Sequence, residues 1–179
     1  MFLVFLVACK PSLQYNGDSI TNYPDMEMIL RENIEPFQKS PYTYKLLTIE
    51  DGKKDSTVLK AAEVDWDAFK KPFLKANIFK DKLDRHYTID FMTDTSMGKL
   101  TLLLTAVHPS EITSKMSVTA RSSDNKIMSV YIEARDAGFF KTTEYKLLFV
   151  NEKSIQIQER TKSIFSKLHT KITTLRFLN

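Results

Sequence analysis

Three histidines and two closely spaced aspartate pairs are the residues whose types could perform metal or acid-base chemistry in this chain of 179 residues. His86, His108 and His169 lie far apart, and no two have the i, i+4 spacing that places two imidazoles on one helical face. None of them is next to the single cysteine. Zinc normally needs three or four clustered nitrogen, sulfur or carboxylate ligands. The sequence therefore predicts no metal site.

The aspartate pairs have spacings that favour structural roles. Asp65 and Asp67 flank Trp66 where a helix is expected to begin, so they would cap that helix and interact favourably with its dipole. Asp90 and Asp94 point the same way from an expected strand, but the rise of a strand separates them by roughly 13 Å. That separation is too long for the two carboxylates of a glycosidase.

Glycine is scarce, and this excludes several catalytic and nucleotide-binding motifs. No glycine pair flanks a serine in the Gly-x-Ser-x-Gly pattern that presents a hydrolase nucleophile. The P-loop and dinucleotide-binding patterns are also missing, as is the Asp-rich calcium loop. We therefore expect a chain with no recognisable catalytic residue and no cofactor.

The only cysteine, Cys9, ends an apolar run. Its sulfur is an atom that could accept a diacylglycerol group, and the small residue Ala8 directly precedes it. Leu6, Val7, Ala8 and Cys9 resemble the lipobox of bacterial lipoproteins. The resemblance implies that residues 1–8 are a signal-peptide remnant and that Cys9 is the site of lipid attachment.

This resemblance also implies a subcellular location. Lipoproteins held at the inner membrane commonly have an aspartate after the cysteine, whereas this chain has Lys10, so the outer membrane facing the periplasm is favoured. The next residues contain turn formers without periodicity, which predicts a flexible tether over residues 9–23. An alternative interpretation of the apolar run is a buried N-terminal strand with an ordinary core cysteine. The run is too short to span a bilayer.

The rest of the chain, residues 24–179, has the composition of one globular domain, with 42% hydrophobic and 27% charged residues overall. The formal net charge is +4. A nucleic-acid binder would need an unbroken basic stripe, but aspartates interrupt the densest lysine cluster, between Lys70 and Lys82. We therefore expect no nucleic-acid partner.

Apolar spacing predicts two helices early in this domain. The first covers residues 25–35 and ends or kinks at Pro36, because an interior proline removes a hydrogen bond. The second begins after Asp65 and is expected to break at Pro72. Between them, an Asp-Gly turn joins extended segments 42–49 and 56–62, which is a hairpin signal.

From His86 onward, apolar residues alternate with polar ones at a period of two, as in strands with one buried face. Short polar turns separate expected strands at 87–92, 99–107, 112–119, 126–134, 143–150, 153–158 and 169–178. The predicted fold class is α+β, a curved antiparallel β-meander of about seven to nine strands. We expect it to form an open half-barrel with the two N-terminal helices packed on it.

A second resemblance covers most of this domain. Its spaced aromatic residues and two late strands are similar to those of uncharacterised lipoproteins from Bacteroidota. The residues that carry the similarity are Trp66, Phe69, Phe73, Tyr87, Tyr145-Lys146-Leu147-Leu148 and Ile155-Gln156-Ile157-Gln158. This group implies no activity.

Aromatic and methionine side chains offer one candidate site. The first interpretation is packing in the core, and it includes Phe139 and Phe140. The functional interpretation is an apolar groove for an acyl chain or similar guest, lined by Trp66, Phe69, Phe73, Met92, Met116 and Met128. The sequence thus predicts a lipid-anchored cell-envelope protein that is a non-enzymatic binder of a partner protein or a lipid-like ligand. The alternative is an envelope hydrolase or lipid-modifying enzyme without a recognisable motif.

Overall fold

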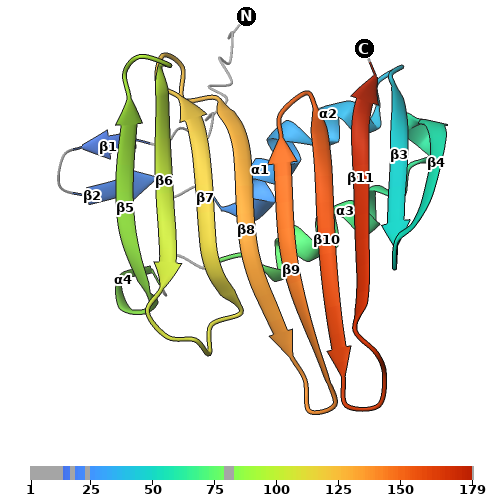
Figure 1. The fold of residues 1–179 in the computed structure, drawn as a ribbon. Coiled ribbons are helices and arrows are strands. Elements are labelled where there is room, and N and C mark those ends of the chain that lie inside the picture. Colours follow the sequence, from blue (N-terminus) through green and yellow to red (C-terminus); the bar gives the residue numbers. More distant parts are fainter. Residues whose placement is uncertain (1–13, 17–18, 23–24, 79–82, 179) are drawn as a thin grey trace, which may run out of the picture.

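The computed structural model describes residues 14–16, 19–22, 25–78 and 83–178 (Figure 1). Nine of its strands form one antiparallel sheet. They are β3 (Thr43–Glu50), β4 (Lys53–Lys60), β5 (Tyr87–Asp94), β6 (Lys99–Ala106), β7 (Thr113–Arg121), β8 (Ile127–Ala137), β9 (Lys141–Val150), β10 (Ser154–Ser163) and β11 (His169–Leu178). The sheet is open and half-barrel-like, with helices on one face. The predicted α+β class is confirmed.

The strand order is β4-β3-β11-β10-β9-β8-β7-β6-β5. Strands β5 to β11 are a meander in which each strand pairs with the next one along the chain. The early hairpin of β3 and β4 joins this meander at its far end, beside the last strand. Thr43 lies opposite Leu178 and Glu50 opposite Lys171, so the two ends of the domain are held together by one ladder.

The turn between β3 and β4 is formed by Asp51 and Gly52, which both have positive φ, 48° and 84°. Two left-handed residues in a two-residue turn match the right-handed twist of the flanking strands. The predicted hairpin is therefore confirmed, with Thr43 paired to Lys60 at its open end.

The first predicted helix forms and ends two residues earlier than expected. Helix α1 (Met26–Asn33) begins after Asp25, whose carboxylate accepts a hydrogen bond of 2.9 Å from the backbone N–H of Glu27. A second short helix, α2 (Glu35–Gln38), has Pro36 in its first turn, where a missing N–H costs nothing. The break between the two helices lies at Ile34, two residues before the proline at which it was expected.

The second predicted helix, α3 (Trp66–Lys75), does not break at Pro72, so that expectation is wrong. Asp65 caps it by accepting from the N–H of Ala68 at 3.1 Å. The carbonyl of Pro72 accepts from Ala76 at 3.1 Å, so the ladder resumes after the proline. Burial of Phe73 against the sheet holds the last turn in place. Helix α4 (Leu83–His86), which was not expected, leads into β5.

Two further strands lie within the segment expected to be a tether. β1 (Gln14–Asn16) and β2 (Ser19–Asn22) pair antiparallel as a separate two-stranded sheet. The prediction of a flexible tether did not anticipate this small hairpin. Residues 1–13, including the candidate lipid site Cys9, lie outside the described residues.

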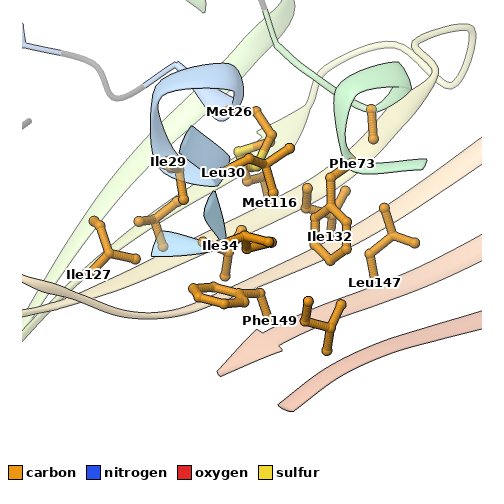
Figure 2. Packing of buried hydrophobic residues seen from close by; sticks show 14 of the residues in the cluster. Met26, Ile29, Leu30, Ile34, Phe73, Met116, Ile127, Ile132, Leu147 and Phe149 are labelled. Carbon is orange, nitrogen blue, oxygen red and sulfur yellow. The ribbon is translucent and has the colours of Figure 1, made fainter. Parts of the chain in front are cut away.

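The core lies between the helices and the inner face of the sheet (Figure 2). From the helices, Met26, Ile29 and Phe73 point toward it, and the sheet contributes fully buried side chains such as Ile132 and Leu147. The outer face carries polar cross-strand neighbours instead. There, Lys115, Glu133 and Lys146 are adjacent on β7, β8 and β9 and alternate in charge.

A buried aromatic cluster joins the β3–β4 hairpin to this core. The Tyr44 ring packs edge-on against Trp66 and Phe177, each with a centroid separation of 5.2 Å. Its hydroxyl donates a 2.8 Å hydrogen bond to the carbonyl of Phe37. The indole N–H of Trp66 donates to the carbonyl of Ala61 at 2.8 Å. These side chains pack as core, and their polar atoms are satisfied within it.

Tyr87 makes the stability of this fold sensitive to alkaline pH. Its ring is buried, its hydroxyl donates to the carbonyl of Thr113 at 3.0 Å, and burial raises its pKa to about 12, with the charge of Glu111 adding to the rise. The pKa of an unfolded tyrosine is about 10. The folded state therefore holds this proton more tightly, and its stabilising effect is complete below pH 10 and lost as pH rises to 12.

We expect the free energy of unfolding to fall by about 2–3 kcal/mol between pH 10 and 12 because of this group. In Tyr87→Phe, the decrease in the free energy of unfolding that Tyr87 causes should disappear. Below pH 10 the variant should be less stable than the unaltered protein, because it lacks the hydrogen bond to the Thr113 carbonyl. Urea denaturation of both proteins at pH 9 and pH 11.5 measures their stability and its change with pH. Equal pH slopes for the variant and the unaltered protein would contradict the assignment to Tyr87.

Candidate functional site

The candidate site lies beside α3, which crosses the inner face of the sheet (Figure 1). One side of this helix is fixed by Trp66, Phe69 and Phe73, which are buried in the core. On both flanks of the helix the packing is incomplete. Two cavities result, and both are lined in part by Ala68 of the helix and Glu159 of β10.

The first cavity, of about 270 Å³, lies between the second half of α3 and strands β8 to β10. We call it the Ala134 cavity. Small and apolar side chains make most of its wall, and charged groups occupy the rest. Its lining is Ala68, Lys71, Pro72, Lys75, Ala76, Ile112, Ala134, Asp136, Tyr145 and Glu159. Alanines facing one another across the helix and the sheet leave this space, because no side chain is long enough to fill it.

The charged groups of the Ala134 cavity balance one another. Two lysines, Lys71 and Lys75, and two carboxylates, Asp136 and Glu159, line it. Lys75 and Asp136 form an ion pair, and that hydrogen bond raises the pKa of Lys75 above its usual value. Both side chains of the pair are about half exposed, so the pair contributes little stability. The formal charge of the lining is zero, so the wall does not select a guest by its net charge.

Tyr145 is the uncharged polar side chain of this wall and is half-buried. Burial raises the pKa of its phenol, and the nearby carboxylate of Glu159 adds to the rise. At neutral pH the hydroxyl therefore keeps its proton and can donate or accept a hydrogen bond. The Ala134 cavity thus combines an apolar wall with one neutral polar group that could orient a guest.

The second cavity, of about 330 Å³, lies on the other flank of α3, over β3, β10 and β11. We call it the Leu46 cavity. Its walls are Leu46, Thr48, Leu59, Glu63, Val64, Asp65, Ala68, Phe69, Ile157, Glu159, Lys171 and Thr173. Three carboxylates and one lysine line it, so it is more acidic than the Ala134 cavity.

The structure brings together four of the six residues of the predicted groove, as core packing. Trp66, Phe69, Phe73 and Met116 are buried in the one hydrophobic cluster, and among them only Phe69 lines a cavity described above. Met92 lies on the opposite face of the sheet, 63% exposed, because it alternates with Phe91. Met128 is half-buried at the start of β8. The six do not form one groove.

Two phenylalanines expected in the core are exposed instead. Phe139 and Phe140 are 88% and 57% exposed in the turn between β8 and β9. This part of the core-packing interpretation is wrong. Buried and exposed side chains alternate along a strand, but these two residues lie in the turn between two strands, so the alternation does not place them.

Cavity-lining residues that sequence reasoning missed are mostly small. Ala68, Ala76 and Ala134 carry no chemistry, and Tyr145 and Glu159 had no visible partner. The one available signal was a small residue at an inward position of a strand, as at Ala134. Whether a small residue leaves a cavity depends on the element opposite, which the sequence does not show.

The histidines pair separately in the structure. Nδ1 of His86 lies 2.7 Å from a carboxylate oxygen of Glu111, and Nδ1 of His169 lies 2.7 Å from one of Asp51. His169 also contacts Glu50 through its Nε2 atom, at 3.3 Å. Within the described ranges, no group of three or more histidine, cysteine or acidic side chains is arranged to hold a metal ion.

Comparisons with known proteins add no family to this description. No protein-family model matches the chain, and no curated protein matches it. Of the helices in the described part of the chain, none is both long and apolar enough to cross a bilayer.

Proposed function

We propose that this protein is a lipid-anchored protein of the bacterial cell envelope, without catalytic activity, that holds an apolar, lipid-like chain beside α3. The observation that carries this proposal is the Ala134 cavity. It is a space of about 270 Å³ with a largely apolar wall, next to the buried hydrophobic core. Ligand sites in proteins are typically concave, mostly apolar and furnished with a few polar groups.

The chemistry of the lining selects among guests. Ala134, Ile112 and Pro72 offer hydrocarbon surface, whereas the lysines and carboxylates cancel in charge. A hydrocarbon chain would restore contacts that these walls lack. Of the two guests expected from the sequence, a partner protein and an apolar ligand, the cavity favours the apolar ligand.

The place of action rests on the sequence motif. The resemblance of Leu6, Val7, Ala8 and Cys9 to a lipobox supports lipid attachment at the cysteine, and Lys10 supports delivery to the outer membrane. A protein held there would meet the acyl chains of phospholipids and lipoproteins. This surrounding is consistent with an apolar guest.

Filling the cavity provides the test. Ala134 lies on the inner face of β8, and Ala137, three residues later on the same strand, is exposed on the outer face. We expect Ala134→Leu to weaken binding of a dansyl-labelled fatty acid at least about tenfold, because the added methyl groups occupy the space of the guest. Ala137→Leu, the matched control, should bind as the unaltered protein does.

Stability separates blocking from misfolding in this experiment. Ala134→Leu fills a void, so its free energy of unfolding should stay the same or rise. Fluorescence titration and urea denaturation on the same samples give both quantities. Equal affinity of Ala134→Leu and Ala137→Leu for the probe would refute the Ala134 cavity as the binding site.

A further inference from the structure

The lower end of the sheet carries a group of exposed aromatic side chains. The turn from β8 to β9 and the turn from β10 to β11 extend there side by side (Figure 1). Phe139 and Phe140 belong to the first turn, and Ile164 and Phe165 to the second. Phe165 is 82% exposed, and Ile164 is also exposed. Large apolar side chains gathered on a surface commonly mark a site of interaction.

The two turns behave as one structural unit. The rings of Phe139 and Phe140 are 4.7 Å apart between centroids, and that of Phe165 is 6.1 Å from Phe140. The backbone N–H of Ile164 donates to the carbonyl of Phe140 at 3.2 Å, which continues the β9–β10 ladder beyond its last pair. We call Phe139, Phe140, Ile164 and Phe165 the aromatic tip.

The charged residues within the two turns are all lysines. Lys141, Lys162 and Lys167 lie in the segments 137–143 and 161–168, which contain no aspartate or glutamate. All three lysines are exposed. Lysine side chains beside aromatic rings suit the boundary of an anionic bilayer, where rings enter the headgroup region and ammonium groups meet lipid phosphates.

We propose that the aromatic tip inserts into the interface of a bilayer that contains anionic lipid. Hairpin turns at the end of a sheet are protruding surfaces, and a fluid bilayer accepts such a shape without a preformed pocket. The lysines supply the charge complementarity. This contact is separate from lipid attachment at Cys9 and independent of any guest in the Ala134 cavity.

Vesicle flotation tests this proposal with residues 9–179 carrying Cys9→Ala, so that neither an acyl group nor the apolar run of residues 1–8 contributes. The tip variant replaces Phe139, Phe140 and Phe165 with serine. The matched control replaces Met92 and Met97 with serine. These two apolar side chains are 63% and 65% exposed, and they lie away from the aromatic tip, Met92 in β5 and Met97 in the turn that follows it. Circular dichroism verifies that both variants fold. The vesicles contain either phosphatidylglycerol with phosphatidylcholine or phosphatidylcholine alone.

We expect the tip variant to partition to anionic vesicles at least about tenfold more weakly than the parent chain, and the control to match the parent. Replacing one lysine with glutamine should weaken binding about fivefold at low salt. Equal flotation of the tip variant and the parent would overturn the proposal. A different result would also overturn it. If sedimentation velocity shows that the parent chain self-associates and the tip variant does not, while both float equally with vesicles, the aromatic tip is an interface between protein chains.

Discussion

We expect Phe73→Ala to lower the free energy of unfolding by about 3–5 kcal/mol. Phe73 is fully buried on α3, and Figure 2 shows it reaching from this helix toward Ile132 and Leu147 of the sheet. Removing the ring leaves a void that the surrounding strands fill only in part. The loss is large because Phe73 joins the helix to the sheet just after Pro72, where the helical ladder lacks a donor.

Leu74→Ala is the matched control for this prediction. Leu74 is the next residue on the same helix and is 43% exposed, so its truncation should cost about 1 kcal/mol or less. Urea denaturation measures both variants. A loss for Phe73→Ala as small as that for Leu74→Ala would show that α3 is not held by this contact. The cavities beside the helix would then lack a fixed wall.

The second large effect is expected at the other end of the chain. Cys9→Ala should abolish incorporation of labelled palmitate completely, because Cys9 has the only thiol in the sequence. Metabolic labelling in a bacterial host, followed by intact mass measurement, shows whether residues 1–8 are removed. The control is Ser12→Ala, which changes a neighbouring residue and should leave labelling unchanged.

The opposite result has a definite meaning as well. A mature chain that keeps residues 1–8 and an unmodified thiol would contradict the lipoprotein assignment and favour the buried-strand interpretation. Labelling is the right measurement here, and membrane association is not, because the aromatic tip is proposed to bind membranes without an acyl group. The two membrane contacts can therefore fail separately.

Much of the fold could be predicted because its determinants are local. Alternation of apolar and polar residues located the strands from β5 to β11, and Asp51-Gly52 identified the first hairpin, since only a few residues adopt two left-handed conformations in succession. Asp65 marked the start of α3 through its hydrogen bond to the Ala68 N–H. Each of these signals acts within a few residues.

What could not be predicted depends on contacts between distant segments. The pairing of β3 with β11 joins residues more than a hundred positions apart, and no local pattern encodes it. Continuation of α3 through Pro72 depends on burial of Phe73 against the sheet, which outweighs the helix-breaking effect of proline. A short apolar pair such as Phe139-Phe140 gives no sign by itself of whether it faces a core or water.

The candidate site was the hardest part to foresee for a related reason. A cavity is a property of two surfaces that meet, and Ala134 and Ala76 form a wall only because α3 lies over β8. The aromatic and methionine residues selected from the sequence are large, and large side chains fill space. The small residues beside them create it.

A hydrocarbon chain in the Ala134 cavity would place its protons beside the alanine methyl groups of the wall. Short-range contacts between a bound fatty acid and these methyl groups can be measured by nuclear magnetic resonance. Protein labelled with carbon-13 at the alanine methyls, in complex with palmitate, gives intermolecular nuclear Overhauser contacts. Contacts from the chain protons to Ala134 and Ala76, with none to Ala137 or Ala120, are the predicted result. Contacts to Ala137 without Ala134, or none at all from a palmitate-saturated sample, would exclude the Ala134 cavity as the site of the chain.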